Sequence, residues 1–373
     1  MGHEVHILTS TGVWDKCSSR SNIDEIFDVK SWHQKQELLF KVKFHAYDLS
    51  WLKKWPRIAF YINRLLPFIF IPYLHFRHRF DVIHEYTSTP ALIYRSYFLK
   101  VLLNVKLYHT IIAEIPTFMG SHCWLKYLTP EIDKIICTNR SIHQNFLSIG
   151  YSPNNLSLVP LGVNFEKFEK LPARFLMKKK YGFDQKKTVV LFLGPLENHK
   201  GYKVFVEGAL KALERTNNIL FVLATYDSPD INLRSYAERK NEIVDLVCSF
   251  PENFKIMEGI HNIAELMAFS NFIIIPQTSI DGATAHPVTM LEAMASKRVV
   301  IASDLKAISE LIIHRKTGYL FSNKNPGNMA DVLLEAMNEN ISNEQIALNG
   351  YNLVRSKYRV DEIASLIGAI YAE

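Results

Sequence analysis

The chain has 373 residues, of which 48% are hydrophobic and 21% are charged. This balance is typical of a folded globular protein and excludes a long disordered chain, and the length predicts two or three domains. The net charge of +6 is modest for this length. Residues 1–6 contain neither a basic run nor a small-residue cleavage site, so we expect no signal peptide. The four cysteines lack CxxC spacing, which favours reduced structural thiols over a disulfide framework or a zinc site.

Short apolar runs in the first half of the chain predict strands that alternate with helices. The expected strands lie at residues 5–9, 82–85, 106–110, 134–138 and 157–160. The expected helices lie at residues 90–103 and 141–149. This alternation indicates an α/β protein with a doubly wound parallel sheet.

The second half repeats the rhythm more regularly. The expected strands lie at residues 188–193, 219–224, 254–257, 271–275 and 299–302, and the expected helices at 202–215 and 291–295. The pattern lapses at residues 161–180, where we expect the hinge. We therefore divide the chain into a first lobe (residues 1–165), a second lobe (166–355) and a C-terminal helix (356–373) that packs back on the first lobe. Parallel sheets bind ligands at the carboxyl ends of their strands, so we expect the site between the lobes.

Residues 51–80 differ from the rest of the chain, because they contain six Lys or Arg and nine Phe, Tyr or Trp but no Asp or Glu. Basic and aromatic residues together favour an anionic membrane surface. Asn63, Arg64, Pro67 and Pro72 interrupt the segment and argue against a membrane-spanning helix. Two alternatives are a core helix with basic solvent-facing residues and a patch for single-stranded nucleic acid. No nucleic-acid-binding module accompanies the segment, so we expect no nucleic-acid partner.

Several short motifs follow one another from residue 80 onward. They are FDVIH at 80–84, LVPLGVN at 158–164, GPLENHKG at 194–201, PVTMLEAMA at 287–295 and GYL at 318–320. In this order and at these separations they resemble glycosyltransferase family 4, whose members are retaining enzymes of the GT-B fold. The resemblance implies two Rossmann-like lobes that face a central cleft, with a nucleotide-sugar donor bound by the second lobe.

The motif at 194–201 resembles the family's phosphate loop, and Lys200 lies in it between Gly194 and Gly201. A lysine in a turn that opens a helix can reach phosphate oxygens, although Lys200-Gly201 could also be an ordinary turn. The resemblance implies that a cation, backbone amides and a helix dipole neutralise the leaving diphosphate. We therefore expect no metal and no cofactor other than the nucleotide sugar itself, linked to UDP or GDP.

A second donor contact is expected where His286, Pro287, Val288 and Thr289 lead into a helix, because N–H groups at a helix start favour an anion. By the same resemblance, Glu292 binds the ribose hydroxyls. The alternative is a glutamate that only complements the helix dipole.

In the first lobe, His109 lies at a predicted strand end and is the expected catalytic residue. The resemblance implies that a histidine here lines the cleft near the sugar, whereas the alternative is a structural histidine. His84 and Glu85, at another predicted strand end, are likewise either residues that line the cleft or structural residues. Glu114 could also reach the cleft.

The chain departs from the family pattern at three places. Thr284 occupies the position of a glutamate that contacts the donor sugar, and Asp281 is the candidate substitute acid. Pro195 replaces an arginine of the phosphate loop. Residues 2–9 resemble the family's second strand, so we expect the opening strand to be missing and Met1 to be an internal methionine.

The leading hypothesis is a retaining, metal-independent glycosyltransferase that moves a hexose from a nucleotide sugar to a hydroxyl of a lipid-linked or polysaccharide acceptor. We expect it in the cytoplasm, peripheral on the inner face of the cell membrane. The rival hypothesis is a non-catalytic protein that binds nucleotide sugars and regulates an active partner. An epimerase on the same two-lobed scaffold is the third.

Overall fold

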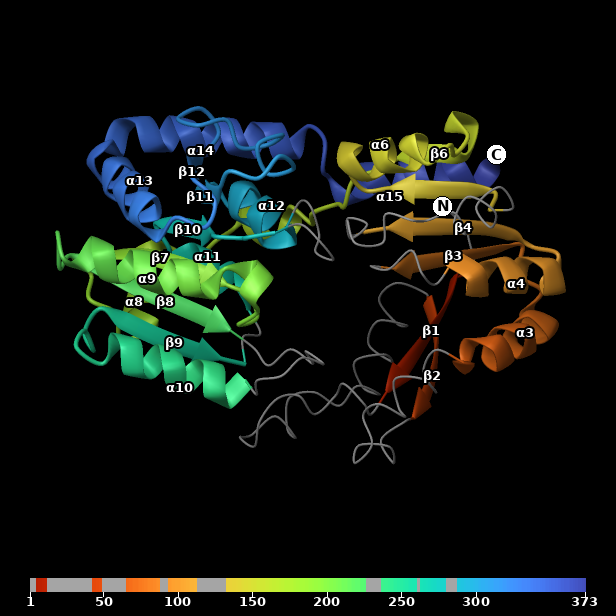
Figure 1. Cartoon of the computed structure of the whole chain (residues 1–373), viewed down its shortest axis with the longest axis horizontal. Coiled ribbons are helices and arrows are strands. Elements are labelled where there is room, and N and C mark those ends of the chain that lie inside the picture. The colour runs from red at the N-terminus through yellow and green to blue at the C-terminus, as the bar shows by residue number, and fades with distance from the viewer. Residues whose placement is uncertain are drawn as a thin grey trace.

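The computed structural model describes residues 5–11, 42–48, 65–87, 93–112, 132–225, 236–259, 262–279 and 287–373. Within these residues the chain forms two α/β lobes that lie side by side (Figure 1). All paired strands are parallel, and each lobe has its own sheet with helices against it. The predicted two-lobed α/β fold is therefore confirmed.

The second lobe is built on six strands in the order β12-β11-β10-β7-β8-β9. These strands are β7 (Thr188–Leu193), β8 (Ile219–Thr225), β9 (Phe254–Glu258), β10 (Phe272–Ile275), β11 (Val299–Ser303) and β12 (Tyr319–Phe321). All seven residues of β8 are buried, as are all four of β10. The sequence predicted every strand of this sheet except β12. Strands covered on both faces need nearly continuous apolar sequence, and runs of Val, Ile, Leu and Phe mark β8 and β10.

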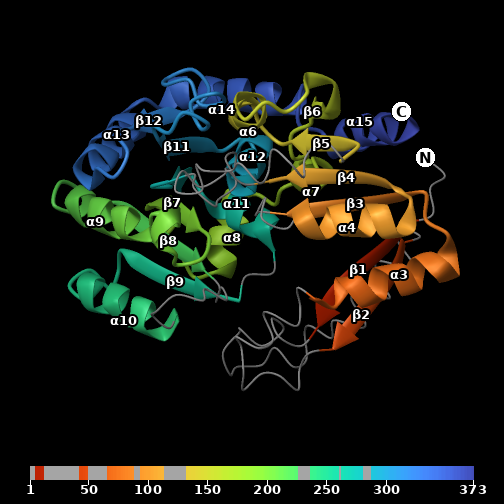
Figure 2. The same ribbon diagram turned by 45° about the vertical axis from the view of Figure 1, so that its right-hand side comes forward.

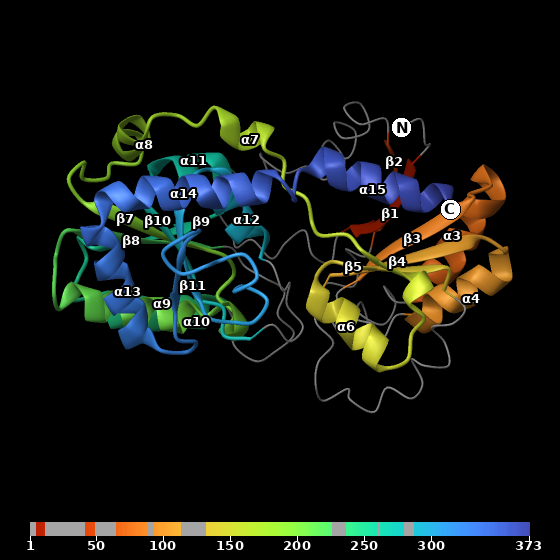
Figure 3. The same ribbon diagram turned by 90° about the horizontal axis from the view of Figure 1, so that it is seen from above.

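Helices cover both faces of this sheet (Figure 3). They are α7 (Glu166–Glu169), α8 (Arg174–Lys180), α9 (Tyr202–Leu213), α10 (Tyr236–Val247), α11 (Ile263–Phe269), α12 (Val288–Ala295), α13 (Pro326–Asn338) and α14 (Asn340–Arg355). Asn262 and Asn325 cap α11 and α13, since each side chain accepts a hydrogen bond from a backbone N–H three residues on.

The first lobe contains a four-stranded sheet in the order β3-β4-β5-β6 and a separate pair, β1-β2. The strands are β1 (Val5–Thr11), β2 (Val42–Asp48), β3 (Val82–Thr87), β4 (Lys106–Ile111), β5 (Lys134–Cys137) and β6 (Leu156–Leu158), and the helices are α3 (Pro67–His78), α4 (Ile93–Leu103) and α6 (Arg140–Ser148). The sequence did not predict β2. The expected loss of an opening strand stays a prediction.

Two segments that are far apart in the sequence meet where the chain passes between the lobes. The Val163 N–H donates to the Tyr358 carbonyl oxygen at 2.7 Å, and the Val360 N–H donates to the Val163 carbonyl oxygen at 3.1 Å. A Cβ on Gly162 would lie 2.8 Å from the Val360 Cα, so the two crossings are in tight contact. The hinge is shorter than the predicted 161–180, because α8 belongs to the second lobe.

Helix α15 (Val360–Ala372) follows the second lobe in sequence but lies against the first (Figure 3). Its Ile363 and Ile370 are buried in one cluster with Tyr108, Ile136 and Val159 of the first lobe. This apolar contact covers one face of the four-stranded sheet.

Helix α3 lies next to α4 on the outer side of the first lobe (Figure 1). Among the described residues, no helix has both the length and the apolar character needed to cross a membrane.

Candidate functional site

The strand order of the second lobe locates the candidate site. The chain runs from β7 outward to β8 and β9, and then returns to β10 on the other side of β7. Ligands of open parallel sheets bind outside the carboxyl ends of the two strands where the order reverses, which here are β7 and β10. A cavity of about 80 Å³ lies at this point, and the residues that line it are Phe192, Leu193, Gly194, Pro195, Lys200, Ile274, Ile275, Pro276, Gln277, Pro287 and Thr289.

The loop after β7 is held close to the segment after β10. Gly201 ends the short 3-10 turn at Asn198–Lys200 and has a positive φ of 76°. A Cβ at Gly201 would lie 1.7 Å from the carbonyl oxygen of Pro276. Only glycine fits there, because any side chain would require both a strained φ and a displaced backbone.

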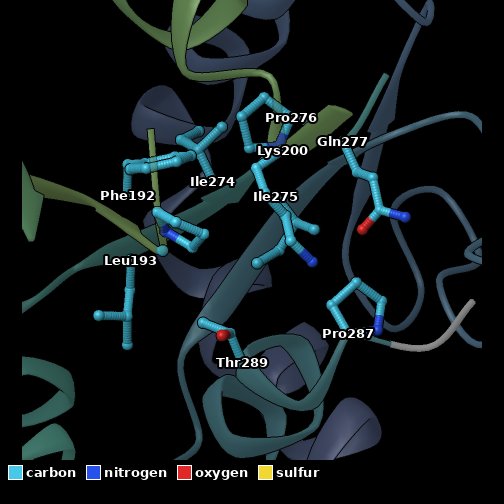
Figure 4. Close-up of a pocket in the computed structure, with 11 residues that line it drawn as sticks. Phe192, Leu193, Lys200, Ile274, Ile275, Pro276, Gln277, Pro287 and Thr289 are labelled. Carbon is cyan, nitrogen blue, oxygen red and sulfur yellow. The ribbon is translucent and has the colours of Figure 1, made fainter. Parts of the chain in front are cut away.

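Two hydrogen bonds from Thr278 strengthen this contact. Its N–H donates to the His199 carbonyl oxygen and its hydroxyl to the Asn198 carbonyl oxygen, both at 2.9 Å. The two loops therefore form one wall of the cavity. Figure 4 shows that Lys200, Gln277, Pro287 and Thr289 surround the cavity from three different segments of the chain.

Lys200 supplies positive charge to the cavity. Burial lowers the pKa of its ammonium group, and the nearby Glu197 carboxylate opposes this change. A cation that has lost part of its hydration gains more from a bound anion than an exposed lysine does.

Helix α12 approaches the cavity with its amino end. Pro287 precedes the first turn and lines the cavity together with Thr289. The amino end of a helix carries partial positive charge, so α12 and Lys200 favour the same kind of ligand, an anion such as a phosphate.

Glu292 lies one turn further along α12. Burial raises the pKa of its carboxyl group to about 7, although the positive charge of Lys167 acts in the opposite direction. A carboxyl group held in this way can accept hydrogen bonds from the hydroxyls of a ligand.

The structure thus brings Gly194, Lys200, Pro287 and Thr289 around one cavity, with Gly201 directly behind Lys200. Val288 is in the first turn of α12 and is 41% exposed, but it does not line the cavity. His286, Asp281 and Thr284 lie outside the described residues.

The sequence analysis missed Gln277, which also lines the cavity. Its side-chain N–H donates to the Ser279 carbonyl oxygen at 3.0 Å. Gln277 follows β10 as Lys200 follows β7, so its position at the carboxyl end of a predicted strand was the signal that could have found it.

His109 is fully buried in β4, and its Nδ1 is 3.9 Å from a carboxylate oxygen of Glu85 in β3. His84 lies on the opposite face of the sheet, beneath α15. There its two ring nitrogens are hydrogen-bonded to the hydroxyls of Tyr371 and Thr110. Burial lowers the pKa of His84 to about 4, so it is neutral at physiological pH. Through these two hydrogen bonds, His84 connects α15 to the first lobe. Glu114 lies outside the described residues.

Within the residues that the structure describes, no three His, Cys, Asp or Glu side chains come together in a way that could hold a metal ion.

Comparisons with known proteins agree with this geometry. Residues 173–353 match the family described as glycosyl transferases group 1. An uncharacterized glycosyltransferase of Methanocaldococcus jannaschii is 24% identical over 66% of this chain, and the chain spans 62% of that protein's length. The N-acetyl-alpha-D-glucosaminyl L-malate synthase of Bacillus anthracis is 19% identical over 99% of this chain and 89% of its own length.

The fold also matches solved structures. HepE of Anabaena, crystallised with UDP and glucose, superimposes with a TM-score of 0.75 at 14% identity, covering 99% of both chains. A glycosyltransferase of Rickettsia africae superimposes with a TM-score of 0.72 at 18% identity, covering 91% of this chain and 86% of its own. The chain therefore has the GT-B fold, and its second lobe matches the family described as glycosyl transferases group 1.

Proposed function

We propose that the protein is a retaining, metal-independent hexosyltransferase that uses a UDP- or GDP-linked sugar and a hydroxyl of a lipid-linked or polysaccharide acceptor. The observation that carries this proposal is the half-buried Lys200 in a cavity at the carboxyl ends of β7 and β10, next to the amino end of α12. The nucleotide diphosphate would bind Lys200 and the first turn of α12, and Glu292 would accept hydrogen bonds from the ribose hydroxyls. Since HepE was crystallised with UDP and glucose, UDP is the first candidate for the nucleotide of the donor.

The chemistry follows from where charge develops. When the bond between the sugar and the diphosphate breaks, negative charge accumulates on the leaving phosphate. Lys200 and the dipole of α12 stabilise that charge in a site from which water is partly excluded. In a front-face reaction, the acceptor hydroxyl attacks from the side of the leaving group and its proton passes to a phosphate oxygen. Such a step needs no strong protein base, and the proposal therefore includes none in the second lobe.

His109 is the candidate residue of the first lobe for contact with the sugar. Its full burial and its position 3.9 Å from Glu85 also suit a structural histidine. Replacing His109 with Asn separates these roles: loss of turnover with an unchanged melting temperature supports the catalytic role, whereas a lower melting temperature with unchanged turnover supports the structural one.

The rival proposal, a non-catalytic nucleotide-sugar-binding protein, is favoured by Thr284 and Pro195, which replace a family glutamate and arginine. Asp281 is the candidate substitute acid. The two proposals agree on donor binding and differ only in turnover. Measuring release of UDP or GDP from the matching sugar conjugate, with and without candidate acceptors, therefore distinguishes them.

Donor binding is tested first by thermal unfolding of the whole chain with UDP, GDP, ADP and their common sugar conjugates. A ligand that binds only the folded state raises the melting temperature. We expect a clear increase with one nucleotide family, and the absence of an increase with all of them would contradict the proposal.

Replacing Lys200 with Ala should weaken nucleotide binding by about 1.5–3 kcal/mol, which is the range for a hydrogen bond to a charged group. The matched control is Lys211→Ala on the exposed face of α9, which should leave the affinity unchanged. Titration calorimetry of both variants measures the difference, and equal affinities would show that the Lys200 loop does not bind phosphate.

A further inference from the structure

Helix α3 exposes apolar side chains to solvent along one face. Leu65, two residues before the helix, and Ile69, Tyr73 and Phe76 within it have exposed fractions of 61, 67, 56 and 70%. They are spaced by four, four and three residues, which places them above one another on a helix. An ordinary surface helix has polar residues at such positions.

Helix α4 repeats this feature beside α3. Its Phe98, Val101 and Leu102 are 51, 63 and 55% exposed. The Phe68 and Phe98 rings meet edge to face, with centroids 5.5 Å apart, so the two helices are in direct contact (Figure 2). We call these seven residues, Leu65, Ile69, Tyr73, Phe76, Phe98, Val101 and Leu102, the α3–α4 face.

The α3–α4 face is a concentration of apolar surface and not a general property of the molecule. The described residues contain nineteen large apolar side chains that are exposed, and seven of them belong to this face. Exposed apolar residues that cluster in this way mark an interaction surface.

The charges around the face are positive. Neither residues 65–80 nor residues 93–106 contain an Asp or Glu. Arg77, Arg79 and Lys106 are exposed near the carboxyl ends of the two helices, whereas Lys100 is paired with Asp133 at 3.0 Å. The face is therefore suited to an anionic partner.

A cavity of about 540 Å³ lies at the same carboxyl ends, and its lining includes Arg79, Lys106 and Asp81. The carboxylate and the partial negative charge of two helix ends oppose the two cations there. This balance favours attraction to a diffuse layer of negative charge over a specific pocket for one headgroup.

We propose that the α3–α4 face binds the surface of an anionic lipid bilayer, with both helices lying in the interface. The apolar stripe would enter the boundary between headgroups and acyl chains, and Arg77, Arg79 and Lys106 would contact anionic headgroups. Tyr73, Phe76 and Phe98 suit this depth, because aromatic rings favour the interface between water and lipid.

A second copy of this chain fits the face less well. Self-association through the face would join two surfaces whose nearby charges, Arg77 and Arg79, have the same sign, and neither α3 nor α4 has an acidic residue among those the structure describes to pair with them. The bilayer proposal goes beyond the proposed transfer reaction and does not depend on it.

The test is co-sedimentation of the whole chain with vesicles of phosphatidylcholine alone and of phosphatidylcholine with phosphatidylglycerol at about 3:1. We expect binding only to the anionic vesicles, and weaker binding as salt rises. The variant Arg77→Gln with Arg79→Asn should lower the partition coefficient roughly 25-fold, since each basic residue accounts for about a fivefold change. Asparagine is used at position 79 because Arg79 has a positive φ of 54°, which asparagine tolerates.

The apolar part is tested separately by Ile69→Gln with Phe76→Gln, which should lower the partition coefficient about tenfold or more. Matched controls in the second lobe are Val244→Gln with Leu246→Gln, which removes two exposed apolar side chains of α10, and Lys186→Gln with Lys211→Gln, which removes two exposed charges. Both controls should bind vesicles as the unchanged chain does.

The proposal is wrong if the α3 variants bind vesicles as well as the controls, or if the unchanged chain binds neither kind of vesicle. It is equally wrong if the unchanged chain forms a dimer that the α3 variants abolish, because the partner would then be a second copy. Thermal shift with the nucleotide that stabilises the unchanged chain should be the same in every variant. Failure of vesicle binding with an intact nucleotide response therefore leaves the donor site unaffected.

Discussion

Helices α9 and α3 both contain twelve residues, and both lie on the outside of a parallel sheet. The surface that α9 exposes to solvent is polar, whereas the surface that α3 exposes includes large apolar side chains. On α9, the exposed positions are Lys203, Glu207 and Lys211, and Phe205 is completely buried. On α3, the exposed positions include Ile69 and Phe76. Helix α9 thus follows the usual pattern of a water-facing helix, and α3 does not.

Each lobe thus has an energetically unfavourable arrangement of a different kind. The second lobe partly buries the ionisable groups of Lys200 and Glu292, whose charged forms would be more stable in water. The first lobe exposes apolar groups that would be more stable in a core. Departures from folding rules concentrate at functional surfaces, and these two are the surfaces for which we propose functions.

The largest expected effect comes from replacing one phenylalanine in each of these helices. Phe205→Ala should lower the free energy of unfolding by about 3–5 kcal/mol, because it leaves a cavity in the core of the second lobe. Phe76→Ala should change it by less than about 0.5 kcal/mol, since its side chain is already exposed. Urea unfolding of both variants measures the difference, and a large loss for Phe76→Ala would contradict the exposed position of α3.

A smaller loss of stability is expected when alanine replaces a glycine that has a positive φ in the second lobe. Gly201→Ala should cost about 3 kcal/mol, from the strained φ together with the contact with Pro276. Gly182→Ala is the matched control, because its φ is 69° but no atom lies within 4 Å of the added Cβ. It should cost about 1 kcal/mol. Equal losses of melting temperature would indicate that the Lys200 loop can move away from the segment after β10.

The smallest effect concerns the pH dependence contributed by Glu292. Its pKa in the folded protein is about 7, above that of an ordinary glutamate. The folded state therefore keeps a proton that the unfolded state has lost, and this group lowers stability as pH rises from about 4.5 to about 7. Glu292→Gln removes that loss, so the variant should gain stability relative to the unchanged chain at pH 8 but not at pH 4.5.

Thermal unfolding at the two pH values, together with nucleotide titration, checks this expectation. We expect Glu292→Gln to bind the nucleotide more weakly at pH 8, where the carboxylate is ionised and is the better acceptor. If the stability of Glu292→Gln relative to the unchanged chain is the same at both pH values, and the variant binds the nucleotide normally, Glu292 is not part of the site.

Strands β8, β10 and β11 of the second lobe could be predicted from sequence because all their residues are buried. Two-sided burial leaves an unbroken apolar run, such as residues 188–193, which differs clearly from its surroundings. Strand β12 is only three residues long and β2 alternates apolar with polar residues, so neither produced such a run. The Lys200 loop could be located because its glycines and lysine stand together in the chain.

The direction in which a side chain faces was harder to predict than the position of the strand or helix that contains it. His84 and His109 lie in neighbouring strands, but His84 faces α15 and His109 faces the other side of the sheet. Which side a strand residue faces depends on the packing of α15, which comes from the far end of the chain. Residues 67–76 of α3 are apolar all round, so their sequence contains no signal for which face is exposed. The position of Gln277 in the same cavity as Lys200 likewise depends on the pairing of β10 with β7.

The return of α15 to the first lobe has a consequence for how the molecule is synthesised. Most domains can fold as soon as their own stretch of chain has left the ribosome. Here the face of the first sheet that contains Tyr108 and Ile136 is completed by Ile363 and Ile370, which are made only after the whole second lobe. The first lobe is thus a discontinuous folding unit, and one of its apolar faces stays uncovered until the second lobe and α15 have been synthesised.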